Sequence, residues 1–304
     1  MHKNILAIIV IIILASLTYF FITRKPKDLI LTTVPESYNS VSLVNESDDI
    51  YLKLYINQKN TTLIDTQKIA NAYFTDAKLD TIINTQVKDI SYYGEVDFDG
   101  TPYYCYQFHL VVDTLENIEI DEAYLRINYY HLEDVVIRIG SLSIYKVNAF
   151  ECDDFRITNL KGIVNVIDNK KTLVGIIIRF ENVRDDKITI TDVKPLDVNL
   201  SCSDYYQVDN RNIKANEDIS SILGYEYDIN QNSKDINISF TNEISILFPL
   251  AYQNHYEIPQ CGLVISYTLH GKDKKAYFNE FCYFINHERL IDLDELIFYH
   301  YENN

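Results

Sequence analysis

The stretch at residues 50–57 reads IYLKLYIN and alternates apolar with more polar side chains at a period of two. Successive side chains of a β-strand point to opposite faces, so this pattern predicts a strand with one buried and one solvated face. The pattern recurs at residues 236–241 (INISFT) and 263–270 (LVISYTLH). Half-buried strands of this kind are typical of antiparallel sheets.

Turn signals join these strands into hairpins. Asp99-Gly100 separates the strand-like runs 92–98 and 103–112, and this dipeptide supplies the positive φ angles of a type I′ turn. The sequence predicts three further hairpins: 125–129 with 135–139, 173–183 with 188–191, and 263–269 with a return through 277–285. Helical patterns are few, and they are confined to residues 65–77, 217–223 and 289–298.

Many short strands and few helices indicate an all-β, mainly antiparallel fold. We expect a membrane anchor at residues 1–27 and a juxtamembrane linker at 28–48, which contains Pro35 and is rich in Ser and Asn. Two immunoglobulin-like β-sandwich modules in series then account for residues 49–150 and 151–304, since one sandwich takes about 100 residues. The second module is expected to end in a short C-terminal helix or strand.

The anchor is predicted from an apolar run at residues 5–22, which contains nothing more polar than Ser16, Thr18 and Tyr19. Eighteen helical residues span roughly 27 Å, close to the thickness of a hydrocarbon core. Cleavage as a signal peptide is disfavoured because Ile13 occupies the −3 position of the nearest site, which ends at Ala15. The sequence therefore predicts a single transmembrane helix, with the membrane as one partner.

The orientation of this helix rests on two opposing signals. Arg24, Lys25 and Lys27 follow the run and only Lys3 precedes it, which leans toward a cytoplasmic body. A short tail followed at once by a long apolar run is instead typical of an N-terminal signal anchor. We expect the body on the extracytoplasmic side of the cell membrane, and keep a cytoplasmic body as the alternative.

Charge excludes one class of partner. The chain has a formal net charge of −17, and because residues 1–27 carry +4, the remaining 277 residues carry −21. A field of this sign repels phosphate backbones, so nucleic acid is not an expected partner. The acidic face instead attracts cations or basic protein partners.

Cysteine and histidine spacing predicts no metal site and no cofactor. The five cysteines, Cys105, Cys152, Cys202, Cys261 and Cys282, contain no C-x-x-C pair. We expect single buried thiols, with one disulfide between Cys261 and Cys282 as the alternative. Cys105 is expected to face solvent, because it shares a strand face with Gln107 and His109.

One constellation suggests an enzyme. His131, Cys202 and Arg211 occur in the order found in sortases, and in this respect the chain resembles those anchored cysteine transpeptidases of β-barrel build. The resemblance implies Cys202 as nucleophile, His131 as the cation that lowers its pKa and Arg211 at the oxyanion. The sequence departs from the family in lacking a Thr before the cysteine, a Gly before the histidine and a Gly-rich run.

Tyrosine is the other unusual feature, with 25 Tyr, 14 Phe and no Trp. Most tyrosines suit half-buried strands, but outward pairs can form a binding face for protein. The candidate pairs are Tyr103 with Tyr104, Tyr205 with Tyr206 and Tyr299 with Tyr301. We therefore expect a membrane-anchored, non-catalytic binding or accessory module at the cell surface, with the sortase-like enzyme as the alternative.

Overall fold

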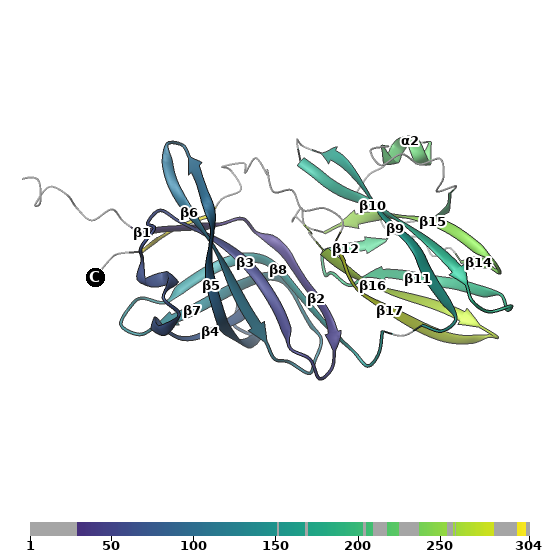
Figure 1. Ribbon diagram of the computed structural model, residues 1–304, viewed down its shortest axis with the longest axis horizontal. Helices are drawn as coiled ribbons and strands as arrows, with labels where there is room; N and C mark the ends of the chain where they lie inside the picture. Colours follow the sequence, from purple (N-terminus) through teal and green to yellow (C-terminus); the bar gives the residue numbers. More distant parts are fainter. Residues whose placement is uncertain are drawn as a thin grey trace, which may run out of the picture.

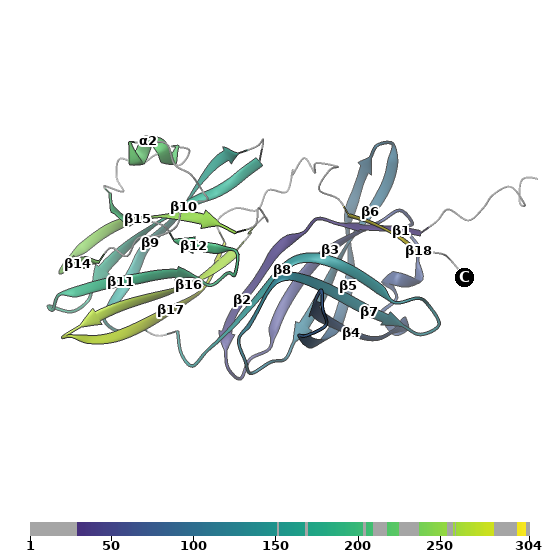
Figure 2. The ribbon, with the colours of Figure 1, turned by 180° about the vertical axis from the view of Figure 1, so that it is seen from behind.

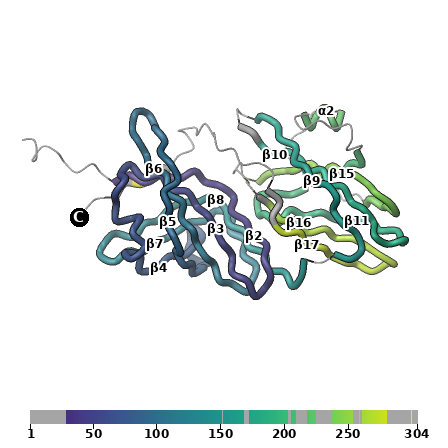
Figure 3. Tube along the Cα trace, viewed as in Figure 1, coloured from purple at the N-terminus to yellow at the C-terminus, as the bar shows by residue number. Residues whose placement is uncertain are grey.

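The computed structural model describes residues 29–150, 152–167, 170–202, 205–208, 218–224, 237–253, 258, 260–282 and 297–301. Strands dominate these residues and pair mainly antiparallel, which confirms the predicted all-β class. Figures 1 and 2 show two strand-rich bodies side by side, and Figure 3 shows that one contains the N-terminal and the other the C-terminal half of the chain. We call them the N-terminal sheet and the C-terminal sandwich.

The N-terminal sheet has nine strands in the order β18-β1-β3-β6-β5-β4-β7-β8-β2. Its strands are β1 (Leu29–Thr33), β2 (Glu36–Leu43), β3 (Asp48–Ile56), β4 (Ile69–Asp76), β5 (Ile82–Phe98), β6 (Thr101–Val112), β7 (Ile118–Tyr129), β8 (Val135–Val147) and β18 (Ile297–Tyr301). Strands β2 and β3 also contact each other, so the sheet curls over and encloses its core.

The alternation at residues 50–57 forms β3 as predicted. Ile50, Leu52, Leu54 and Ile56 are at most 3% exposed, whereas Tyr51 between them is 52% exposed. The buried residues pack with the inner faces of β6, β7 and β8 in one apolar core. Burial of these side chains provides the main favourable term for the fold of this sheet.

The predicted linker at residues 28–48 is wrong for most of its length, because it forms β1 and β2. Strand β2 pairs in parallel with β8 from Glu36 to Leu43. Its serines and asparagine are buried and bonded to other polar groups, so its polar composition does not mark a solvated connector. Gly140 on β8 allows this pairing, since a Cβ there would lie 2.0 Å from the carbonyl oxygen of Glu36.

The predicted helix at 65–77 is also wrong. Asp65 accepts a hydrogen bond from Gln67 N as a helix cap would, but only a 3₁₀ turn follows, η2 (Thr66–Lys68), after a similar turn η1 (Thr62–Ile64). Residues 69–76 then form β4, which pairs with β7 and β5. Tertiary pairing overrides the local helical preference here, because Ala72 and Phe74 are buried in the core.

Two predicted hairpins are confirmed, and the first of them has its turn at the predicted residues. Asp99 and Gly100 have φ angles of 51° and 74° between β5 and β6, as a type I′ turn requires. His270 and Gly271 take the same conformation between β16 and β17, with φ of 54° and 71°. The hairpin of β7 with β8 is confirmed as well.

The C-terminal sandwich packs two sheets face to face. One contains β12 (Leu200–Cys202), β15 (Glu243–Tyr252), β10 (Lys170–Asn182) and β9 (Phe155–Ile167) in that order, with β13 (Tyr206–Gln207) also on β15. The other contains β14 (Ile238–Phe240), β11 (Ile188–Pro195), β16 (Gln260–Leu269) and β17 (Lys272–Cys282). Helix α2 (Ile219–Leu223) confirms the predicted helix near 217–223. A single apolar core lies between the sheets.

One predicted hairpin in this half is wrong. Strands β10 and β11 do not form a hairpin, since the chain crosses from one sheet to the other between them. Residues 297–301 form β18, which is the strand alternative of the predicted C-terminal helix or strand, and residues 289–296 lie outside the described residues. Strand β18 pairs antiparallel with β1 of the N-terminal sheet, from Leu29 with Tyr301 to Thr33 with Ile297. The C-terminal end therefore returns to the first strand (Figure 1).

The two bodies share a buried interface. Val41, Tyr145 and Val147 of the N-terminal sheet form an apolar cluster with Leu196 and Val264 of the sandwich. Beside it Asp197, which is 1% exposed, accepts hydrogen bonds from Ser37 Oγ (2.6 Å) and Asn39 Nδ2 (3.1 Å). Burial raises the pKa of Asp197 above its usual value, although these hydrogen bonds oppose the shift.

The predicted transmembrane segment, residues 5–22, lies outside the described residues. Within the described ranges, no helix has the length and apolarity needed to cross a membrane.

Candidate binding surface

The three residues of the sortase-like constellation are not brought together as far as the structure describes them. Cys202 lies on β12 inside the core of the C-terminal sandwich. His131 lies in the turn between β7 and β8 of the N-terminal sheet, exposed and with a φ of 65°. Arg211 lies outside the described residues. Burial raises the pKa of the Cys202 thiol, and the charge of Asp192 adds to this, so thiolate formation at neutral pH is disfavoured.

The other described cysteines are also free thiols. Cys261 is fully buried and its Sγ donates to the carbonyl oxygen of Gly262 at 3.0 Å, so the alternative disulfide to Cys282 is not formed. Cys105 is 3% exposed, and the prediction that it faces solvent is wrong. Nearby on this outer face Val34, Phe98 and Tyr103 form a small apolar cluster. Burial raises the pKa of Cys105 to about 11.

The tyrosine pairs expected to point outward do not form an exposed face. Tyr103 and Tyr205 are 4% and 6% exposed, and the Tyr205 hydroxyl both donates to Asp192 and accepts from Val193 N. Tyr299 is partly buried, and its hydroxyl accepts a hydrogen bond from Arg138 N at 2.8 Å. Nothing is described of the Tyr301 side chain.

Two exposed tyrosines, Tyr51 and Tyr93, lie instead on β3 and β5, on either side of β6. We define the aromatic face as Tyr51, Lys53, Tyr93 and His109, with Asp49 at its edge. Tyr51 and Tyr93 are 52% and 49% exposed. Strand register creates this set, because Tyr51 pairs with His109 across β3 and β6, and the neighbouring side chains along β3 point into the core.

Side-chain contacts order the aromatic face. The Tyr51 and His109 rings stack with centroids 4.6 Å apart and planes inclined by 20°. His109 Nε2 lies 2.5 Å from Asp49 Oδ1, which holds the imidazole from its other side. Lys53 Nζ lies 4.7 Å from the centroid of the Tyr93 ring, within the range of a cation–π contact. Rings held in this way lose little conformational entropy when they bind a partner.

A β-bulge contributes to the exposure of Tyr93. The register between β5 and β6 shifts between Tyr92 and Gly94, which leaves Tyr93 as the extra residue of β5. Bulges re-aim side chains at the edges of sheets. Sequence reasoning missed this residue, although the exposed polar side of the 50–57 alternation already contained Tyr51 and Lys53.

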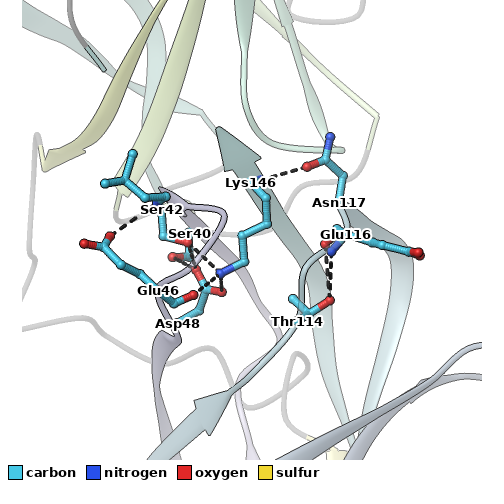
Figure 4. A network of polar contacts seen from close by, with 9 residues as sticks. Ser40, Ser42, Glu46, Asp48, Thr114, Glu116, Asn117 and Lys146 are labelled. Carbon is cyan, nitrogen blue, oxygen red and sulfur yellow. Dashed lines mark hydrogen bonds and ion pairs between the residues drawn. The ribbon is translucent and has the colours of Figure 1, made fainter. Parts of the chain in front are cut away.

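The most buried ion pair of the N-terminal sheet has a different role. Lys146 Nζ lies 2.6 Å from Asp48 Oδ2, and the two side chains are 2% and 0% exposed. Ser40 and Ser42 donate to Asp48 Oδ1 at 2.6 and 2.8 Å, and Lys146 also donates to the Glu46 carbonyl oxygen (Figure 4). This network joins β8 to the turn between β2 and β3. Its charges are buried and paired, so it is structural.

No metal centre emerges from the described ranges, in which no three His, Cys, Asp or Glu side chains are grouped to hold an ion. Exposed tyrosines with polar neighbours are typical of protein interfaces, where Tyr is enriched.

Comparison with known proteins identifies no family. No protein-family model matches the chain, and no curated protein does. Among solved structures, the C-terminal domain of the AgI/II polypeptide BspA from Streptococcus agalactiae is 8% identical, with a TM-score of 0.21 over 82% of this chain and 98% of that one. A second structure of a BspA C-terminal domain scores 0.22, and a titin A168169 structure, 11% identical, scores 0.18 over 82% of this chain and 97% of its own. Scores of this size do not establish a common fold.

Proposed function

We propose that this chain is a single-pass membrane protein whose body is a non-catalytic binding or accessory module at the extracytoplasmic surface, and that the aromatic face binds a protein partner. The observation that carries the proposal is the ordered exposure of Tyr51 and Tyr93 beside Lys53 and His109. These side chains are fixed by contacts within the sheet but remain open to a partner. The tyrosine rings offer apolar surface and their hydroxyl groups can form hydrogen bonds. This combination suits a protein partner better than a small apolar ligand.

The membrane anchor is residues 5–22 in this proposal. Strand β1 begins at Leu29, seven residues beyond the run, so the N-terminal sheet is the part of the body next to the membrane. The body is acidic, so anionic lipid headgroups repel it. This repulsion supports a function away from the lipid surface. An extracytoplasmic position is proposed from the signal-anchor layout.

We assign an immunoglobulin-like topology to the second module, and a boundary near residue 150. Strand order supports the topology: β9, β10 and β15 are neighbours in one sheet, and β11, β16 and β17 in the other. In chain order these correspond to strands A, B, E and C, F, G of an immunoglobulin sandwich. The boundary is supported by the change of sheet between β8 and β9.

The transpeptidase alternative has no comparable support. Its nucleophile lies in an apolar core with a raised thiol pKa, and its histidine is on a turn of the other body. A thiol activated for attack needs a nearby cation and access to substrate. The described surroundings of Cys202 provide neither.

Site-specific photo-crosslinking tests the proposed surface in cells that make the full chain. A benzophenone amino acid replaces Tyr51 or Tyr93 on the aromatic face, and Tyr130 or Val183 as controls of similar exposure elsewhere. We expect a discrete crosslinked species of defined mass from the two face positions only. Adding His109→Ala should weaken the Tyr51 crosslink, because that substitution removes the stacked ring.

Two outcomes contradict the proposal. Crosslinks of the same mass from all four positions would show a surface without a preferred face. Absence of any crosslink from the face positions, while the controls react, would place the binding surface elsewhere.

A further inference from the structure

The β5 strand has a long open edge. It pairs with β6 from Thr85 to Phe98, but with β4 only from Ile82 to Thr85. Over residues 86–98 no described strand lies on its other side, although the turn η2 approaches β5. Figures 1 and 2 both show the hairpin of β5 and β6 rising clear of the rest of the N-terminal sheet. Open edges expose N–H and C=O groups that can pair with another strand.

Strand β9 provides a second open edge in the other body. It ends the sheet order β12-β15-β10-β9 and pairs with β10 alone among the described strands. Helix α2 reaches only its C-terminal part, where Asp218 accepts from Asn165 Nδ2 at 3.0 Å. Residues 155–164 remain available, which exceeds the five or six residues of an average strand.

The two edges carry opposite charge. Residues 86–98 of β5 contain Lys88, Asp89, Glu95 and Asp97, a net −2, and β9 contains Arg156 and Lys161 with no carboxylate, a net +2. Arg156 already donates two hydrogen bonds to Glu181 of β10, at 2.7 and 2.9 Å, so the β9 edge depends mainly on Lys161 for its attraction to β5. Like-to-like pairing of two β5 edges sets negative charges against each other within an acidic body, which disfavours it. Pairing of β5 with β9 sets opposite charges together, and β9 is a basic strand in a body that carries a large negative charge overall.

An exposed aromatic side chain also lies on the β5 edge strand, where Tyr92 is 50% exposed. Large apolar side chains next to unpaired backbone gain from burial under an added strand.

We propose that the open edge of β5 is a docking site for a second copy of this chain, which pairs through its β9 edge so that molecules associate head to tail. The contact is heterologous, because it uses different surfaces on the two copies. After a first contact the dimer still has one unused β5 edge on one molecule and one unused β9 edge on the other, so assemblies longer than a dimer form at higher concentration. Tyr93 of the aromatic face also lies on β5, but the charged residues through which this inference is tested lie outside that face.

Charge reversal of each edge tests the proposal with the full chain in a fixed detergent. One variant combines Asp89→Lys with Glu95→Lys, and the other combines Arg156→Gln with Lys161→Glu; all four side chains are exposed. Sedimentation velocity should show concentration-dependent association of the native chain, weakened at least about tenfold in either variant. Asp97 is left unchanged because it accepts a hydrogen bond from Gly100 N in the hairpin turn.

The decisive measurement is made on a mixture of the two edge variants. The unaltered β5 of the β9 variant can still pair with the unaltered β9 of the β5 variant, and the lysine-bearing β5 also matches the acidic β9. Differently tagged variants should therefore co-purify, although each alone associates at least about tenfold more weakly than the native chain. Glu133→Lys with Asp134→Lys, in the exposed β7–β8 turn, makes the same change in net charge as the β5 variant and should leave association unchanged. A native chain that stays monomeric at about 100 µM, where even a weak specific contact is populated, overturns the proposal. Association that persists in both edge variants overturns it as well, and neither result bears on crosslinking from the aromatic face.

Discussion

Asp197 shows how a single buried carboxyl can couple the junction of the two bodies to pH. Its Oδ2 accepts from Ser37 and Asn39 of β2, and its Oδ1 accepts from Asn199 N at 2.8 Å. No described cation pairs with it, and burial raises its pKa. The native state therefore retains the Asp197 proton at pH values where the unfolded chain has lost it.

This shift predicts a pH-dependent stability. The stabilising contribution is present below the unfolded pKa of Asp197, near 3.8, and is lost as the pH rises through the native pKa. Urea unfolding of the native protein and of Asp197→Asn, measured from acid to neutral pH, should show the native protein losing stability relative to the variant as pH rises. A difference between the two that stays constant with pH would contradict this assignment.

Gly262 lies where the two bodies leave no room for a larger side chain. A Cβ built there would lie 2.3 Å from Val41 Cγ2 on the other body. Gly262→Ala should therefore destabilise the protein by about 1–3 kcal/mol through overpacking. Gly94 is the matched control, since a Cβ there meets nothing within 4 Å and Gly94→Ala should stay within about 0.5 kcal/mol. Chemical denaturation compares the two, and equal effects would show that the contact between the bodies is loose.

Lys146 stabilises the folded protein through its charge. Lys146→Met leaves the buried Asp48 without its cation, and we expect a loss of about 3–5 kcal/mol in the free energy of unfolding. Lys194 and Glu119 form an exposed pair at 3.8 Å, so Lys194→Met should cost less than about 1 kcal/mol. Similar losses in the two variants would mean that the Lys146 pair is solvated in solution.

At the scale of elements, β18 makes the clearest prediction. It is the outermost strand beside β1, which has few partners on β3, only Leu31 and Thr32. Deletion of residues 297–304 should therefore release β1. Hydrogen exchange of the amides of Leu29–Thr33 should become much faster, while the amides of β10 and β15 in the sandwich stay protected. Unchanged protection of β1 would show that β18 is dispensable for the N-terminal sheet.

Local pattern identified many of the strands but not their partners. The alternation at 50–57 and the Asp99-Gly100 turn are local properties, and both were confirmed. Residues 36–43 contain too few apolar side chains to show as a strand. Their buried polar side chains are satisfied by distant partners, Ser37 and Asn39 by Asp197 of the other body and Ser40 and Ser42 by Asp48. Sequence reasoning also placed the polar binding face on tyrosine pairs, and missed that strand register collects Tyr51, His109 and Tyr93.

For the whole molecule, the orientation of the proposed anchor remains a prediction. With the body outside, protease added to intact cells should degrade it. The body should stay accessible when Arg24, Lys25 and Lys27 are changed to neutral residues. The described cysteines Cys105, Cys202 and Cys261 are buried, so an impermeant thiol reagent should label them only after unfolding. Full protection from protease until lysis would place the body in the cytoplasm.

The sequence by itself determined the strand-rich class, the Asp99-Gly100 turn and the acidic charge of the body. These properties follow from the period of the side chains, from the conformation of glycine and from composition. Each can be read from a few neighbouring residues or from residue counts alone. Tertiary structure alone decided that β10 and β11 lie in opposite sheets, that β18 pairs with β1, and that Cys105 is buried. Strand partners and covered faces depend on contacts between residues far apart in the chain, and the period of a single strand contains no information about them.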